Sequence, residues 1–239
     1  MRAALPVVTA MLLVAIVVAF GHSLDLRISD QAFDFATTTW LVDHESGPLR
    51  LMLYDGPKRM LVLLGLFLLT IVVMHRRLQI GSRARKSALF LLLCLSIVPS
   101  VTGAIKSASG VSCPNAIKRY GGLTPDRHGQ FSFAGFVDPT RTDGCWPSGH
   151  VSGAFALLGI LCLPFPGRRL LAALAMAGGA VMGSYQVMRG AHFASHIVVS
   201  FCIAIVVVTL LQRIVWSRGT EIIEDGDKER QSRHSRRLA

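Results

Sequence analysis

The chain has 239 residues, of which 51% are hydrophobic and only 16% are charged, and its formal net charge is +11. With a mean hydropathy of +0.50, this composition is too apolar for an ordinary soluble domain and indicates a membrane protein. A nucleic-acid-binding protein is also excluded, because the Lys and Arg residues stand in short groups between apolar segments and form no single basic face.

Six apolar segments predict an all-α, polytopic membrane protein built as a six-transmembrane-helix bundle. Several are slightly shorter than the roughly 20 residues that cross a bilayer, so we expect their ends to extend into the flanking polar sequence. The first resembles a secretory signal peptide, but it lacks a small-x-small cleavage site before Gly21, and we interpret it as a retained helix. The segments are about 4–20, 60–74, 88–105, 151–166, 170–188 and 196–216.

Loops rich in Lys and Arg set the expected orientation, because short basic loops stay on the cytoplasmic side of a membrane. Residues 75–87, residues 166–169 and the tail after Trp216 are all basic, and six spans put all three on the same side. We therefore expect a multi-pass protein of the bacterial inner membrane with both termini in the cytoplasm.

Three segments are then expected on the periplasmic side, namely residues 21–59, 106–150 and 189–195. The first has apolar residues at mixed spacing and is expected to form one or two helices along the membrane surface. We expect residues 1–216 to form a single transmembrane domain. Residues 217–239 are basic, polar and low in aromatics, and are expected to be a disordered cytoplasmic tail.

A short motif before the fourth apolar segment is suited to binding an anion. In Trp146-Pro147-Ser148-Gly149-His150, Pro and Gly predict a turn at the start of a helix. Backbone N–H groups at Ser148 and Gly149 and the positive end of the helix dipole favour a phosphate there, with His150 beside it. The alternative is an ordinary capping turn with an interfacial histidine.

A second polar motif precedes the last apolar segment. His192 and His196 are four residues apart, and Arg189 lies one turn before His192, so a helix would put all three on one face. A cation and two imidazoles can bind an oxyanion and supply a nucleophile or a proton shuttle. The alternatives are an interfacial polar patch, or a histidine pair that binds a metal or haem.

Together these motifs resemble the type 2 phosphatidic acid phosphatase (PAP2) superfamily, whose three signatures read KxxxxxxRP, PSGH and SRxxxxxHxxxD. The resemblance covers about residues 106–200. Lys106 begins the first signature, and GAHFAS at 190–195 makes His192 the counterpart of the nucleophilic histidine. Three family positions differ in this chain: Cys113 and Gln186 each stand in place of Arg, and His196 stands in place of Asp.

The resemblance implies a phosphatase in which His192 attacks phosphorus to give a phosphohistidine. His150 would protonate the leaving oxygen and later activate water. Neither a metal nor another cofactor is expected. We expect His196 or Asp143 to orient His192 in place of the missing Asp.

The resemblance also implies a set of groups that bind the phosphate oxygens. Arg189 would replace the missing Arg of the third signature, and Arg119 or Lys118 that of the first. The expected phosphate-binding residues are Lys106, Ser148, Gly149, Arg189 and Arg119.

Two cysteines are expected to form a disulfide. Cys113 and Cys145 are the only cysteines in polar sequence, and both fall in the same segment on the oxidising side of the membrane. Their bond would tether the segment after Lys106 to the motif at 146–150. Three further cysteines lie inside apolar segments and are interpreted as small buried hydrophobes: Cys94, Cys162 and Cys202.

Three functions remain open from the sequence. The first is a hydrolase that removes phosphate from a lipid phosphate or pyrophosphate at the outer leaflet. The second is a phosphotransferase that passes the phosphoryl group to another lipid or a sugar. The third is a non-catalytic lipid-binding or His-ligated redox membrane protein. The expected partners are the lipid substrate and membrane lipids, with undecaprenyl pyrophosphate, phosphatidic acid, phosphatidylglycerol phosphate and a lipid A phosphate all compatible.

Overall fold

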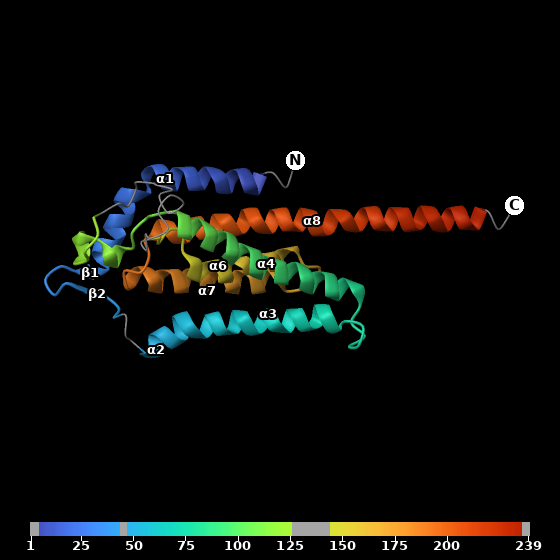
Figure 1. Ribbon diagram of the computed structural model, residues 1–239, viewed down its shortest axis with the longest axis horizontal. Coiled ribbons are helices and arrows are strands. Elements are labelled where there is room, and N and C mark those ends of the chain that lie inside the picture. The colour runs from blue at the N-terminus through green and yellow to red at the C-terminus, as the bar shows by residue number, and fades with distance from the viewer. Residues whose placement is uncertain (1–4, 44–46, 126–143, 236–239) are drawn as a thin grey trace.

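Long apolar helices run side by side through the computed structural model, which describes residues 5–43, 47–125 and 144–235 (Figure 1). Within those ranges five helices are long and apolar enough to cross a membrane. They are α1 (Leu5–Gln31), α3 (Gly56–Met74, preceded by α2, Gly47–Arg50, and a π-helical turn, Leu51–Asp55), α4 (Ser82–Ala108), α7 (Arg168–Met188) and the first part of α8 (Ala194–Ser235).

A sixth apolar segment forms helix α6 (Gly149–Ala156), which continues as a 3-10 helix over Leu157–Cys162. It is shorter than the roughly 20 residues that span a hydrocarbon core. The predicted all-α membrane bundle is therefore confirmed as a class, whereas the count of six spanning helices is not. The first part of the chain also carries a small β-hairpin that the prediction did not include.

Apolar side chains at helical spacing hold the centre of the bundle together. Phe90, Cys94 and Val98 recur every four residues on α4, so they share one face, and all three are fully buried. They belong to one apolar cluster with Val151 of α6 and Val208 of α8. Cys94 and Cys202 are buried, as their interpretation as small hydrophobes predicted, and Cys162 is half-buried.

The segment 21–59 differs from its prediction as surface helices. Residues 21–31 continue α1, and a two-stranded antiparallel hairpin follows, with β1 (Phe33–Asp34) paired to β2 (Thr39–Trp40). The physical reason is an aromatic cluster, since Phe33 and Trp40 pack on each other and both pack on Tyr120 at 5.0–5.2 Å between ring centroids. Burying these rings holds the chain in an extended hairpin.

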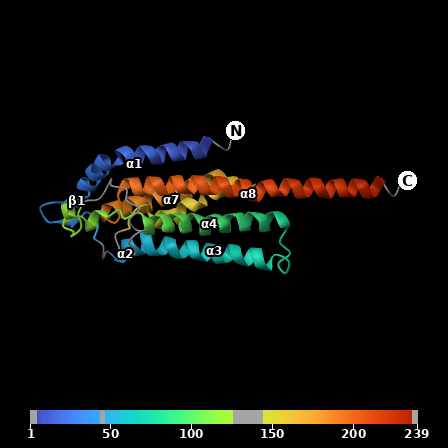
Figure 2. The ribbon, with the colours of Figure 1, turned by 45° about the horizontal axis from the view of Figure 1, so that its top comes forward.

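The expected disordered tail also differs from the structure, in which α8 continues as helix to Ser235. No proline interrupts residues 217–235, and helix-forming Glu, Lys, Arg and Gln are frequent there. In both views this last part of α8 extends beyond the other helices (Figures 1 and 2).

The two ends of the bundle carry different parts of the chain. In Figures 1 and 2, α1 begins and α8 ends toward one end, where the connection between α3 and α4 also lies. The β-hairpin and the end of α4 lie at the other end. The basic segment 75–87 and the motif at 146–150 are thus at opposite ends, as the orientation prediction requires.

A disulfide joins Cys113, which follows α4, to Cys145, which precedes α6, so the predicted pairing is confirmed. Their Cα atoms are 5.2 Å apart, and Cys145 is fully buried. The bond closes a loop with a sequence separation of 32 residues. It therefore ties the end of α4 to the start of α6.

Replacing both cysteines by serine should lower the free energy of unfolding by about 3–4 kcal/mol, because the unfolded chain regains the entropy that the closed loop removes. Thermal unfolding in detergent measures this, with Cys162→Ala as the control because Cys162 is a free cysteine. Equal unfolding temperatures for all three proteins, or free thiols at both positions in the native protein, would contradict the pairing.

Candidate functional site

Hydrogen bonds between α6 and α8 bring two histidines together. The Ser148 N–H donates to the His196 carbonyl oxygen at 3.2 Å. The buried Ser200 hydroxyl lies 2.8 Å from the Ser148 carbonyl oxygen and 2.9 Å from that of His196. These bonds hold the start of α6 against the first turn of α8. As a result, the ring centroids of His150 and His192 lie 6.0 Å apart.

Two predicted cations lie at the same end of the bundle. Lys106 is in the last turn of α4, and Arg189 is the residue that ends α7. The positive charges of both act on His150 and on His192. The structure thus brings together the four residues for which the sequence predicts a catalytic role.

His192 is buried, and its ring contacts the ring of His196. Its Nδ1 lies 3.4 Å from Nδ1 of His196 and 3.4 Å from Sγ of Cys145. Because Cys145 is in a disulfide, its sulfur has no proton to donate, and His196 is the better acceptor for an Nδ1–H of His192. That arrangement leaves the lone pair of His192 on Nε2.

The pKa of the His192 imidazole is held well below its ordinary value. Burial is the largest cause, since it disfavours the charged ring, and the nearby Lys106, His150 and Arg189 lower the pKa further. The ring is therefore neutral near pH 7. A neutral imidazole is the form that can act as a nucleophile.

Several buried polar groups beside these histidines have no hydrogen-bond partner among the described residues. They are the Ser148 hydroxyl, Nδ1 of His150 and both ends of the Gln186 amide. Leaving a buried polar group unpaired costs about 1–3 kcal/mol. Such a group in a native protein calls for an explanation, and a polar ligand supplies one.

Two predicted phosphate-binding roles need correction. The Ser148 N–H is already bonded to His196, so the hydroxyl of Ser148, not its N–H, is the group without a partner. Arg119 lies in a short 3-10 turn and forms a bidentate ion pair with Asp30, with N–O distances of 2.9 and 2.7 Å. Its guanidinium therefore binds Asp30 and not a group beside His150 and His192. Asp143, the alternative orienting residue, lies outside the described residues.

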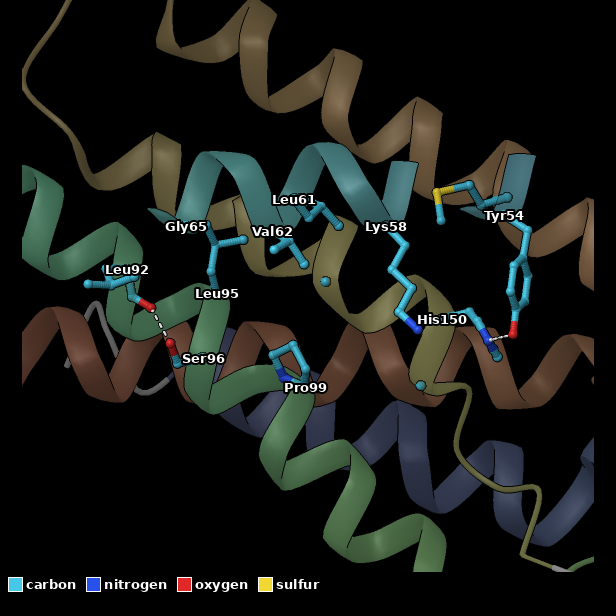
Figure 3. Close-up of a pocket in the computed structure, with 13 residues that line it drawn as sticks. Tyr54, Lys58, Leu61, Val62, Gly65, Leu92, Leu95, Ser96, Pro99 and His150 are labelled. Carbon is cyan, nitrogen blue, oxygen red and sulfur yellow. Dashed lines mark hydrogen bonds between the residues drawn. The ribbon is translucent and has the colours of Figure 1, made fainter. Parts of the chain in front are cut away.

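Tyr54 and Lys58 were not predicted from the sequence. The Tyr54 hydroxyl and Nε2 of His150 are 2.5 Å apart, and the Lys58 amino group points toward His150 (Figure 3). Arg189 lies over the Tyr54 ring, 5.5 Å from its centroid. The sequence signal was a Tyr and a Lys four residues apart where the second apolar segment begins, but nothing local connects that helix with the other motifs.

Asp25 of α1 was also missed. It is 2% exposed, and its carboxylate accepts the backbone N–H of Ser195 at 2.8 Å. Ser195 is in the first turn of α8, where a carboxylate satisfies a free N–H and interacts favourably with the helix dipole. Asp25 thus fixes the helix start that follows His192. A charged residue inside an apolar helix was the available signal.

His150 is one of the residues that line a cavity of about 500 Å³ with mostly apolar walls. The cavity lies between α3, α4 and α6, and Figure 3 shows Lys58 and Tyr54 at the same end as His150. Its other lining residues are mostly apolar: Leu61, Val62, Gly65, Leu92, Leu95, Ser96, Pro99, Gly149, Gly153 and Met182. This shape suits a molecule with a polar head and an apolar chain.

Three potential metal-ligand atoms, from Cys145, His192 and His196, lie within 4.8 Å of one another. The disulfide withholds the thiolate of Cys145 and leaves two imidazoles. A zinc site ordinarily takes three or four protein ligands. The trio in its oxidised form is therefore better suited to proton transfer and nucleophilic attack than to holding zinc.

Comparison with known families gives one match. The model of the PAP2 superfamily matches residues 87–220, which is more than half of the chain. No curated protein and no solved structure matches the chain. The matched range includes Lys106, His150, Arg189 and His192, but neither Asp25 nor Lys58.

Replacing Ser200 by alanine should lower the free energy of unfolding by about 1 kcal/mol, because the carbonyl groups of Ser148 and His196 lose a hydrogen bond. Phosphate release should fall as well, since the start of α6 is then less firmly held against α8. The control is Ser100→Ala, which removes an exposed hydroxyl bonded within α4. Equal losses in both variants would show that the Ser200 contact has no special role.

The His192 ring should remain neutral at pH 6.5 and take up a proton only in more acidic solution, because burial and nearby positive charge lower its pKa. Histidine ¹⁵N chemical shifts measure this directly, with the His192 signal assigned by its absence from a His192→Gln spectrum. A ring that is half-protonated at or above pH 6.5 would contradict the expected environment.

Proposed function

The chain belongs to the PAP2 superfamily, and from this premise we propose that it is a membrane phosphatase that hydrolyses a lipid phosphate or pyrophosphate through a phosphohistidine. Phosphatase-type activity follows from the family. The observation that carries the finer proposal is the opposed pair His150 and His192 beside buried polar groups without partners, at the end of an apolar cavity.

In the first step, Nε2 of His192 attacks phosphorus in line with the leaving oxygen. The N–P bond forms while the bond from phosphorus to the leaving oxygen breaks. Burial and the charges of Lys106, Lys58 and Arg189 lower the pKa of His150 to about 4, and the negative charge of a bound phosphate favours its imidazolium form again. That imidazolium bonds Tyr54 through Nε2 and gives the proton on Nδ1 to the leaving oxygen. The proton neutralises the charge that develops on the departing group.

In the second step, water attacks the phosphohistidine. Nδ1 of His150, now unprotonated, accepts the proton of the water, the new O–P bond forms and the N–P bond breaks. Inorganic phosphate leaves and His192 returns to its neutral form. One histidine thus serves as acid and then as base.

Positive charge and hydrogen-bond donors stabilise the transferring phosphoryl group, whose charge spreads over three oxygens. Lys106 in the last turn of α4 and Arg189 at the end of α7 both exert positive charge on His150 and on His192. The hydroxyl of Ser148 and the N–H of Gly149, the first residue of α6, add neutral donors. Donors of this kind stabilise the transition state without first having to reorient.

The cavity supports a lipid as the substrate. Its walls are mostly apolar and His150 lines it, so a phosphate bound at His150 can place its attached chain between α3 and α4. A water-soluble ester would not gain the free energy of burying that chain. The basic segment 75–87 at the opposite end of the bundle supports a site at the periplasmic, outer-leaflet side of a bacterial inner membrane.

The orientation of His192 differs from the family pattern in a way that affects the rate. His196 takes the position of the family Asp, and its neutral ring can accept the Nδ1–H of His192 at 3.4 Å. An imidazole stabilises a developing positive charge on His192 less than a carboxylate would. We expect His196 to orient the nucleophile with little electrostatic assistance.

Replacing His192 by alanine should abolish phosphate release from a lipid phosphate, because the nucleophile is lost. Replacing His150 by alanine should lower kcat by about 10²–10⁴-fold, the usual contribution of a general acid–base group. A phosphate-release assay with the purified chain in detergent measures both effects. A phosphoenzyme that is labile in acid and stable in base, as phosphohistidine is, should be detectable only in proteins that retain His192.

The control for these variants is His75→Ala, because His75 ends α3 at the opposite end of the bundle. Full activity in His192→Ala with loss only in His196→Ala would place the nucleophile four residues further on, in α8. Wild-type protein that releases no phosphate from undecaprenyl pyrophosphate, phosphatidic acid, phosphatidylglycerol phosphate or a lipid A phosphate would refute the proposed activity.

A further inference from the structure

Lys58 is a cation in an otherwise apolar cavity. It lies in the first turn of α3, and its amino group points toward His150 (Figure 3). Of the residues that line this cavity in the described part of the chain, Lys58 alone is a Lys, Arg, Asp or Glu. The residue is exposed, so its amino group is open to an anion that enters the cavity with the substrate.

The charge of Lys58 affects one of the two histidines and not the other. Its charge acts on His150, whereas the charges that act on His192 come from Lys106, His150 and Arg189. Lys58 lines the cavity together with His150, whereas neither Lys106 nor Arg189 is among the residues that line it. The site contains two separate places for negative charge.

In the proposed reaction, the cleaved phosphate and the leaving group of the substrate occupy these two different places. Attack at phosphorus is in line, so the leaving group departs on the side away from His192. His150 protonates that leaving group, and the cavity begins beside His150. A leaving alcohol is neutral once it has received this proton and needs no cation. A leaving phosphate retains negative charge and does need one.

Resting on the function proposed above, we propose that the substrate is a lipid diphosphate and that Lys58 binds the phosphate that remains on the lipid. Nε2 of His192 then bonds the terminal phosphorus, and the bridging oxygen departs with the inner phosphate and the proton from His150. Water hydrolyses the phosphohistidine. The products are inorganic phosphate and a lipid monophosphate.

The turn before α3 holds Lys58 and Tyr54 on the same side of the helix. Tyr54 lies in the π-helical turn Leu51–Asp55, and Lys58 is four positions further along the chain. At this spacing both side chains lie on the same side of the helix, and both line the cavity. Gly56 ends this turn, and a Cβ there would lie 2.6 Å from the Leu51 carbonyl oxygen. The backbone thus needs glycine at the position that aims both side chains at His150.

A different role for Lys58 is that of an ordinary interfacial lysine whose stem lies on apolar surface while its amino group reaches the headgroup region. Arg59, the next residue of α3, is also exposed and does not line the cavity. Arg59 is therefore the matched control. An interfacial role would make the two residues equivalent.

The test compares a polyprenyl diphosphate with the monophosphate of the same chain, as substrates of the full-length protein in detergent micelles. Wild-type protein should show a higher kcat/KM for the diphosphate. Lys58→Met should lower kcat/KM for the diphosphate by about 10²-fold, the usual effect of removing one group that stabilises a developing oxyanion. The ratio of the two kcat/KM values should fall with it, and Lys58→Arg should restore most of that ratio.

Each other outcome overturns the inference. Equal loss with both substrates in Lys58→Met would mean that Lys58 acts on the cleaved phosphate or on His150. The same loss in Arg59→Met would mean that both act at the membrane interface. A wild-type preference for the monophosphate, with phosphate release still dependent on His192, would refute the diphosphate while leaving the phosphatase in place. No phosphate from either substrate would refute both proposals.

Discussion

The site depends on the hydrogen bonds that join the start of α6 to the start of α8. The Ser148 N–H and the Ser200 hydroxyl both bond the His196 carbonyl oxygen, so two helix ends that are far apart in the sequence are held in contact. His150 is two residues from Ser148, and His192 is four residues before His196, in the bend that leads into α8. Their separation is therefore set by backbone contacts, which change less with side-chain motion than a contact between the two imidazoles would.

Two other contacts restrain the helix ends at this junction. The disulfide at Cys145 ties the segment before α6 to the end of α4, and Asp25 of α1 holds the first turn of α8. Each of them fixes the end of a helix that carries a reactive group. Such contacts matter in a bundle of apolar helices, because within a membrane the hydrophobic effect does not drive the helices together.

The sequence predicted most strongly what depends on local patterns. Apolar segments predicted the helices, and the motifs at 146–150 and 189–196 predicted that His150, Arg189 and His192 meet, since each motif stands at the end of an apolar segment on one side of the membrane. The disulfide followed from two cysteines in one polar segment.

Contacts between residues that are far apart in the sequence were not predictable. Arg119 was assigned to phosphate because Asp30, its actual partner, lies 89 residues away in α1. The N–H of Ser148 was assigned to phosphate because the turn by itself does not reveal the carbonyl group of His196. Tyr54 and Lys58 escaped notice because their helix carries no motif and reaches His150 only in the folded bundle.

The disulfide has a further chemical consequence for His192. A reduced Cys145 would present a thiol 3.4 Å from Nδ1 of that ring, and a thiol proton donated there would favour the tautomer that carries its hydrogen on Nε2. That tautomer has no lone pair directed at the substrate. Formation of the disulfide removes this competing donor, so the same covalent bond that closes the loop also selects the reactive tautomer. The tautomer of His192 on which the proposed attack depends would thus be linked to the oxidation state of Cys145.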